Sequence, residues 1–128
     1  MNLKSKAQWD KMLASTIKAW RKGLKCDDSH GRRSYRVFMA KIQEDDPLCN
    51  FMEKHFEYIS AFEYKKKCGL CPMFSVMEHE CCEEYYKFAD SDTYPQFLAA
   101  LPPMIARLES LKYKDYVEKV REYKEEER

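Results

Sequence analysis

The sequence predicts a small all-α domain, an irregular bundle of about five helices. Apolar residues recur at the 3–4-residue spacing of one helix face in several separate segments. Only 3 glycines and 5 prolines are present, too few for the frequent turns of a β-sandwich or barrel. A length of 128 residues with 45% hydrophobic residues fits one domain, residues 1–128, with a core of its own.

The first expected helix follows Ser5. Ser5 and Gln8 have the spacing of a capping box, in which each side chain satisfies a backbone N–H at the helix start. Trp9 and Trp20 fall on the same apolar stripe behind this cap, so we expect both to anchor the core rather than to form a binding surface. Gly23 is expected to end the helix in the left-handed conformation.

Two further helices are expected before the middle of the chain. One begins near Ser34, ahead of a new apolar stripe. The run Glu44–Pro47 predicts the start of the next, because carboxylates and proline both suit a helix N-terminus. This third helix is expected to end in Lys65–Lys67, cations that complement the negative end of the helix dipole.

The C-terminal part is expected to hold a short helix over residues 83–88 and a further helix opening at Tyr94 and Pro95. Pro102-Pro103 predicts either a kink or a fresh helix start. From Ile105 the apolar residues keep helical spacing almost to the end of the chain.

A cysteine cluster is expected to clip this bundle together. Cys68 and Cys71 have the C-x-x-C spacing of a zinc half-site, and the adjacent pair Cys81 and Cys82 follows closely enough to fold back on them. These four cysteines are the predicted metal ligands, and zinc is the predicted structural cofactor. A disulfide between the two halves, or reduced thiols, are the alternatives.

The fourth ligand stays open, because adjacent cysteines rarely both bind one zinc without strain. His79, Cys26 and Cys49 are the further candidates. In a straight third helix, Cys49 would lie about 28 Å from Cys68, at about 1.5 Å per residue. His79 or Cys26 would therefore join the cluster more easily.

The charge balance excludes a strong global attraction to nucleic acid. Lys and Arg number 23 against 22 Asp and Glu, a formal net charge of +1. The most basic segment contains Arg32, Arg33 and Arg36, which are the predicted partner-binding residues. Together with Lys65–Lys67 they would also suit a nucleic-acid-binding module, the first alternative function.

Other features argue against an enzyme and against a membrane protein. No apolar run approaches the roughly 20 residues that cross a bilayer, and the N-terminus has no signal-peptide pattern, so we expect a cytoplasmic protein. No acid–base or nucleophile–base constellation is visible. A thiol-redox protein that uses Cys68 and Cys71 is the second alternative, although no strand pattern precedes this pair.

The segments Leu48-Cys49, Cys68–Pro72 and Cys81–Phe88 resemble a pattern in small uncharacterised proteins of tailed phages and prophages. The pattern departs at Pro47, where those proteins have another cysteine. The resemblance implies an accessory protein in a host bacterial cytoplasm, with no assigned activity. We therefore expect a non-enzymatic phage-type protein that binds a host macromolecule, most simply a host protein of a defence or transcription system that it inhibits.

Overall fold

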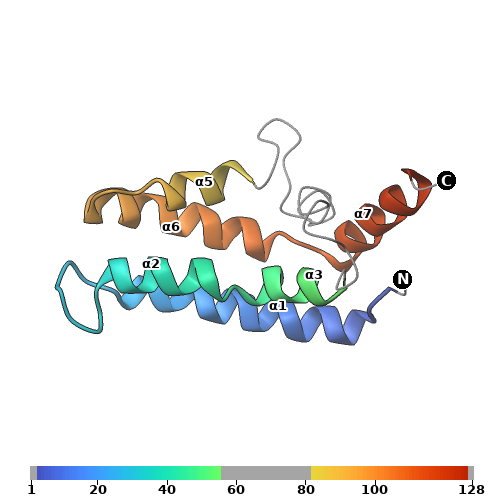
Figure 1. Ribbon diagram of the computed structural model, residues 1–128, viewed down its shortest axis with the longest axis horizontal. Helices are drawn as coiled ribbons and strands as arrows, with labels where there is room; N and C mark the ends of the chain where they lie inside the picture. The colour runs from blue at the N-terminus through green and yellow to red at the C-terminus, as the bar shows by residue number, and fades with distance from the viewer. Residues whose placement is uncertain (1–2, 56–81, 127–128) are drawn as a thin grey trace.

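The computed structural model describes residues 3–55 and 82–126 (Figure 1). Within these ranges the chain forms helices and no strand, apart from one isolated bridge between Asp27 and Ser34. The predicted all-α fold is confirmed. The helices of the described ranges are α1 (Lys6–Arg21), the short 3₁₀-helix η1 (Lys22–Lys25), α2 (Tyr35–Glu44), α3 (Pro47–His55), α5 (Glu83–Ala89), α6 (Tyr94–Glu109) and α7 (Tyr113–Glu126).

The helices form an elongated bundle in which α1 is the central element. Figure 1 shows two layers along the long axis: α1 lies with α2 and α3, which run in the opposite direction, and α6 lies with α5. Helix α1 packs against α3, α6 and α7, and α5 packs against α6. The N-terminus and α7 lie at one end of the bundle, and the loop between η1 and α2 lies at the other.

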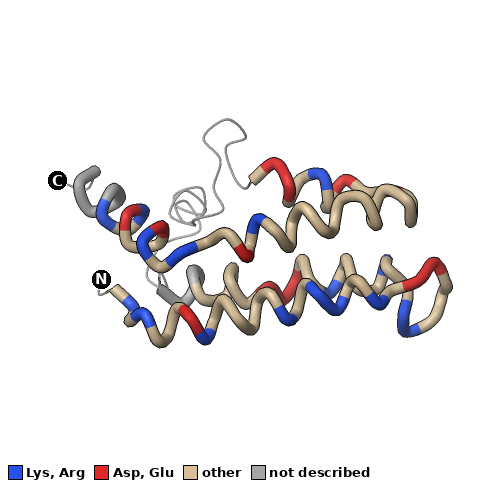
Figure 2. The backbone as a smooth tube through the Cα atoms, turned by 180° about the vertical axis from the view of Figure 1, so that it is seen from behind, with Lys and Arg blue, Asp and Glu red and all other residues tan. Residues whose placement is uncertain are grey.

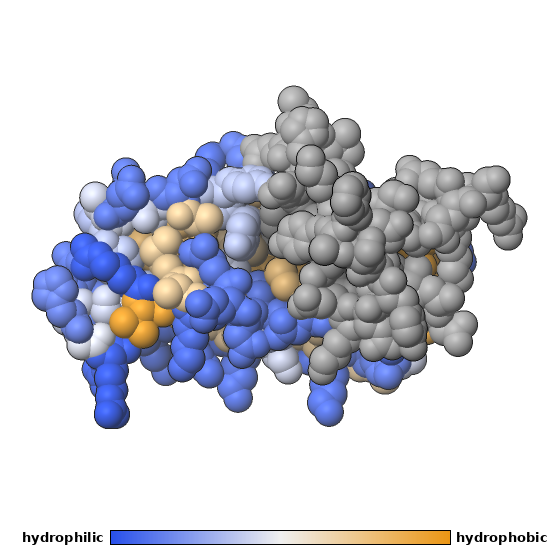
Figure 3. Space-filling view, in the orientation of Figure 1, coloured by the Kyte–Doolittle hydropathy of each residue, from blue (hydrophilic) through white to orange (hydrophobic). Residues whose placement is uncertain are grey.

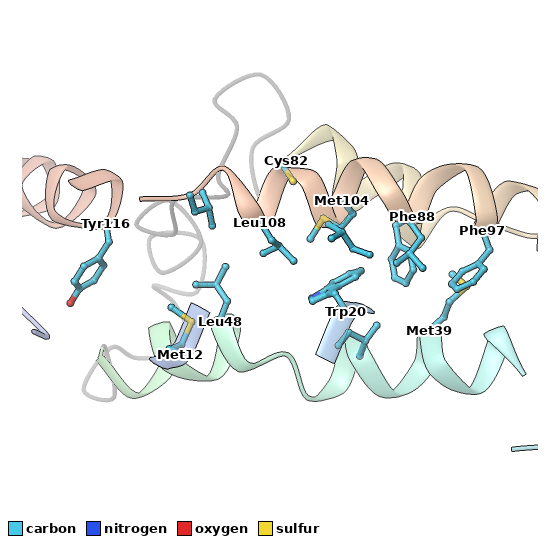
Figure 4. Packing of buried hydrophobic residues seen from close by; sticks show 14 of the residues in the cluster. Met12, Trp20, Met39, Leu48, Cys82, Phe88, Phe97, Met104, Leu108 and Tyr116 are labelled. Atoms are coloured by element: carbon cyan, nitrogen blue, oxygen red, sulfur yellow. The ribbon is translucent and has the colours of Figure 1, made fainter. Parts of the chain in front are cut away.

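The two tryptophans of α1 anchor the core at its two ends, as predicted. Both side chains are fully buried. Trp9 stacks on Tyr116 of α7, with ring centroids 5.2 Å apart, and Trp20 packs edge-on against Phe88 of α5 at 4.7 Å. Figure 4 shows the layer of apolar side chains around Trp20. Other buried members of this core are Met12, Met39, Ile42, Leu48, Phe97, Leu101, Met104, Ile105, Leu108 and Val120.

Two tyrosines of α7 hold the backbone of Lys4, which precedes α1. The Lys4 N–H donates to the Tyr116 hydroxyl at 2.9 Å, and the Tyr113 hydroxyl donates to the Lys4 carbonyl at 2.6 Å. Burial raises the pKa of Tyr116 above its usual value. We call this contact the terminal clasp, because it ties the first described residues to the last helix.

The predicted helix starts are confirmed by their capping bonds. The Gln8 N–H donates to the Ser5 hydroxyl at 3.2 Å, and the Ser5 N–H donates to the Gln8 side chain at 2.9 Å. Thr93 and Gln96 form the same reciprocal pair at the start of α6. Ser34 caps α2 through its hydroxyl. Each cap satisfies backbone donors that the first turn of a helix leaves unpaired.

Helix α6 runs without interruption through Pro102 and Pro103, so the alternative of a fresh start at these residues is wrong. A proline has no N–H, and the carbonyls of Leu98 and Ala99 therefore lack their usual donors four residues later. Both residues are exposed. The helix nevertheless continues through both prolines to Glu109.

The chain from Ile105 onward does not form one continuous helix, although its apolar spacing suggested one. Helix α6 ends at Glu109 and α7 begins at Tyr113. The Lys112 N–H donates to the Asp115 carboxylate at 2.8 Å and so caps the new helix. The turn lets Leu111 and Tyr116 both reach the core from differently directed segments.

Gly23 does not end α1 in the left-handed conformation, and that prediction is wrong. It lies within η1, and its φ is outside the left-handed region. Its role is close packing. A Cβ atom on Gly23 would lie 2.7 Å from Cε1 of Phe38 and 2.8 Å from Cδ2 of Leu101. The missing side chain lets η1 approach α2 and α6 closely.

We expect the substitution Gly23→Ala to lower the free energy of unfolding by about 1–3 kcal/mol, the usual effect of overpacking a core. Urea unfolding followed by circular dichroism measures this change. Gly31→Ala is the control, because its nearest neighbouring atom, the Ser29 Oγ, would be 3.8 Å from the new Cβ. The control should be neutral or gain up to about 1 kcal/mol. Equal stability of both variants would contradict the packing role.

Candidate functional site

The predicted partner-binding arginines lie in and just after the hairpin-like loop that joins η1 to α2. Backbone bonds close this loop: the Asp27 N–H donates to the Arg33 carbonyl at 2.7 Å, and the Tyr35 N–H donates to the Asp27 carbonyl at 2.9 Å. The Tyr94 hydroxyl of α6 donates to the Cys26 carbonyl at 3.0 Å. The loop is therefore fixed to the bundle at both of its ends.

Side-chain bonds fix the turn of the loop as well. The Asp27 carboxylate accepts from the Ser29 hydroxyl and from the Ser29 N–H, the latter at 3.0 Å. These bonds hold the pKa of Asp27 below its usual value. The Ser29 hydroxyl in turn accepts from the Gly31 N–H at 3.3 Å. These bonds fix the backbone of the loop that carries Arg32 and Arg33.

Arg32 and Arg33 border a cavity of about 480 Å³ between η1, the loop that follows it, and α2. A second cavity of about 260 Å³ adjoins it toward α3 and shares Lys22, Phe38 and Lys41 with it. We call the two together the basic groove. The lining residues of the larger part are Lys22, Lys25, Cys26, Arg32, Arg33, Val37, Phe38 and Lys41, and the smaller part adds Ala19, Ile42, Asp45 and Pro47.

The larger part of the groove is lined by five cations and by no carboxylate. None of these five side chains forms an ion pair within residues 3–55 and 82–126. Figure 2 shows Lys and Arg along this end of α1 and in the loop, with the acidic residues of the loop beside them. The charge of Arg33 contributes to the lowered pKa of Asp27, but five positive charges on one rim still attract an anionic group and raise its local concentration. The five cations are Lys22, Lys25, Arg32, Arg33 and Lys41.

The floor of the groove is apolar. Val37 is 50% exposed and faces solvent. Phe38 is partly buried and packs against the core. The Phe38 ring meets Trp20 edge-on at 6.4 Å and Phe97 at 6.0 Å. Figure 3 shows apolar surface at the α2 end of the molecule, surrounded by hydrophilic side chains. The groove therefore combines a cationic rim with an apolar base that belongs to the core.

The structure brings Arg32 and Arg33 into the groove but leaves Arg36 outside it. Arg36 lies 4.7 Å from the centre of the Tyr35 ring and pairs with Asp28 at 3.8 Å. Lys41 lines the groove and was not predicted. Its spacing offers the signal, because Val37 and Lys41 are four residues apart and so lie on one face of α2.

Most of the predicted cysteine cluster lies outside the described residues, so the zinc and disulfide predictions are not tested. Of the described cysteines, Cys82 is buried at the start of α5, and Cys49 is exposed in the first turn of α3. Burial, together with the charge of Asp27, raises the pKa of the Cys26 thiol. No group of three His, Cys, Asp or Glu residues suited to a metal occurs in the described part of the chain. The candidate residues outside it are Lys65–Lys67, Cys68, Cys71, His79 and Cys81.

Comparison with known proteins gives no match: no family model fits the chain, and no curated protein or solved structure is significantly similar to it. The resemblance to phage proteins thus stays a prediction. Among the helices that the structure describes, none combines the length and the apolar character that crossing a membrane requires.

Proposed function

We propose that this protein is a non-catalytic binding protein whose basic groove holds an acidic segment of a partner protein. The observation that carries the proposal is the set of five groove cations, for which the described residues supply no ion-pair partner. The two neighbouring arginines outside the groove are paired: Arg21 with Glu109 at 3.0 Å and Arg36 with Asp28. A carboxylate-rich segment of a partner would form ion pairs with the groove cations, as Glu109 does with Arg21 and Asp28 does with Arg36.

The apolar floor favours a peptide over a nucleic acid. Single-stranded nucleic acid is usually held by aromatic rings whose faces are free to stack on bases. Phe38 is the aromatic residue of the groove, and Trp20, Phe88 and Phe97 surround its ring. A peptide with acidic residues beside one apolar side chain suits both parts of the groove, since the apolar side chain covers Val37 while the carboxylates meet the rim.

The resemblance to phage proteins adds an expectation about the partner: a bacterial host protein, such as a defence or transcription component that this chain inhibits. Structural zinc on Cys68, Cys71, Cys81 and Cys82 would belong to the same expectation. The groove does not depend on either the host partner or the zinc, because its lining residues all lie between Ala19 in α1 and Pro47 at the start of α3.

Reversing two rim charges tests the groove. We expect Lys22→Glu combined with Arg33→Glu to weaken partner binding at least about tenfold, because like charges would then face the acidic segment. The control is Lys11→Glu combined with Arg121→Glu, which changes the net charge equally at two exposed positions outside the groove. Affinity capture from bacterial lysate at two salt concentrations, followed by titration of the captured protein, measures the effect.

The outcomes separate the alternatives. Loss of one acidic protein from the groove variant but not from the control supports the proposal. Equal capture by both variants places the binding site elsewhere. If the wild type captures no protein but shifts DNA or RNA with a steep salt dependence that the groove variant lacks, the nucleic-acid alternative replaces the proposal.

A further inference from the structure

We propose that two copies of this chain associate through the solvent-facing side of α6. No charged residue occurs from Tyr94 to Ala106, and the inward side of the helix is buried in the core. The opposite side is apolar too, and it is exposed. We call it the outer face of α6; its residues are Pro95, Leu98, Ala99, Pro102, Pro103 and Ala106. A helix that is apolar on all sides is normally covered on all sides.

The polar residues of the exposed side are already engaged. Gln96 belongs to the capping box of α6, and Glu109 pairs with Arg21 at 3.0 Å. Leu98 is 44% exposed, one of the most exposed large apolar side chains of the described residues. Figure 2 shows the same contrast, because α6 is uncharged along most of its length while the neighbouring α5 alternates acidic and basic residues.

A second copy is the occupant that this face fits best. Without charges the face can meet an identical face without repulsion, which the basic groove could not do. Alanine and proline are small and let two helix backbones approach closely. The face extends along one helix for about 17 Å, at 1.5 Å per residue from Pro95 to Ala106. Two antiparallel copies about a two-fold axis would cover each other along this whole length.

The charges at the two ends of α6 favour the antiparallel arrangement. Asp90 and Asp92 precede the helix, and Lys112 and Lys114 follow it; all four residues are exposed. The two acids at the second end are engaged, Glu109 with Arg21 and Asp115 with the Lys112 N–H. In an antiparallel pair the acidic end of each helix lies beside the basic end of the other, so opposite charges meet at both edges of the apolar contact. A parallel pair would place like charges together. The dimer does not depend on the proposed function, because the groove is built on other helices.

Analytical ultracentrifugation of the full chain, from micromolar to submillimolar concentration, tests this proposal. We expect a dimer for the wild type and at least tenfold weaker association for Ala99→Glu and for Ala106→Glu, since each places carboxylates in the apolar contact. Ala14→Glu, at an exposed position of α1, is the control and should stay dimeric. Circular dichroism checks that each variant keeps its helix content.

Mixing two variants excludes a simple folding defect. In a two-fold symmetric contact, Ala99→Glu and Ala99→Lys each repel their own copy, but a mixture of the two brings opposite charges together. We expect the mixture to form a heterodimer. A monomeric wild type, a dimer that both glutamate variants leave unchanged, or a mixture that stays monomeric would each overturn the proposal.

Discussion

The substitution Trp20→Ala is expected to lower the free energy of unfolding by about 4 kcal/mol or more, within the range for removing a buried tryptophan. Its indole is fully buried, packs on Phe88 at 4.7 Å and meets the edges of Phe38 and Tyr85. The substitution would leave a cavity among these rings. It would also remove the indole N–H that donates to the buried Asp46 carboxylate. Small domains have total stabilities of only about 5–15 kcal/mol, so the variant should be largely unfolded at moderate urea concentration.

Urea unfolding followed by circular dichroism measures this effect, since the variant keeps only one tryptophan, Trp9, and its fluorescence cannot be compared directly with that of the wild type. Leu24→Ala is the matched control, because Leu24 is 55% exposed and its truncation should change stability by no more than about 0.5 kcal/mol. Substitutions at exposed positions typically change the free energy of unfolding by less than about 1 kcal/mol. If Trp20→Ala changes it by no more than this, then Trp20 does not anchor the core.

The second large effect is expected for Asp46→Ala, about 2–4 kcal/mol of lost stability. The Trp20 Nε1–H donates to Oδ2 of Asp46 at 3.0 Å, and the Leu48 N–H donates to Oδ1 at 2.8 Å. The substitution would leave the buried indole N–H unsatisfied, at about 1–3 kcal/mol, and would remove the cap of α3, at about 1 kcal/mol. Asp10→Ala is the control, since Asp10 forms an exposed pair with Lys6.

A double-mutant cycle with Trp20→Phe assigns the effect to the bond between the two side chains. Phenylalanine keeps the ring but has no N–H, so the cost of Asp46→Ala should shrink by about 1–3 kcal/mol in the Trp20→Phe background. If the losses of unfolding free energy from Trp20→Phe and Asp46→Ala simply add, the result would contradict a stabilising hydrogen bond between Trp20 and Asp46.

Asp46 also gives this prediction a pH dependence. Burial raises the pKa of Asp46 against the opposing effect of its three hydrogen bonds, so the folded chain holds this proton more tightly than the unfolded chain does. Its stabilising contribution is complete below the unfolded pKa of about 3.9 and is lost as the pH rises through the higher folded value. The stability of the wild type relative to Asp46→Asn should therefore fall from about pH 4 upward. A relative stability that rises with pH would contradict a raised pKa.

The helix starts could be predicted from the sequence because each one is decided locally. Ser5, Ser34, Asp46 and Thr93 lie within three residues of the N–H groups that they satisfy. Helix ends were less predictable. The role of Gly23 depends on Phe38 and Leu101, and Leu101 lies far away along the sequence. The local sequence pattern contains no information about which helices pack closely together. Gly23 therefore suggested a helix end and not a point of close packing between η1, α2 and α6.

The candidate site was predictable only in part for the same reason. Local density of charge indicated Arg32 and Arg33, but which arginine faces the groove depends on the bond between Asp27 and the Arg33 backbone. Arg36 is turned to Tyr35 instead, and Lys41 joins the rim because α2 runs back along α1. The hydrogen bond between Trp20 and Asp46 is a similar case. The sequence predicted Trp20 in the core and Asp46 at a helix start, but it did not indicate that the two side chains are in contact.

The terminal clasp has a consequence for how the chain is made. Trp9 stacks on Tyr116, and the Lys4 backbone bonds to Tyr113 and Tyr116 across more than 100 residues of sequence. A ribosome releases the N-terminus first, so α1 emerges long before the helix that covers its first tryptophan. Until Tyr116 has been synthesised and has left the ribosome, Trp9 lacks this stacking partner, so this end of the bundle closes later than the contacts that α1 makes with α3.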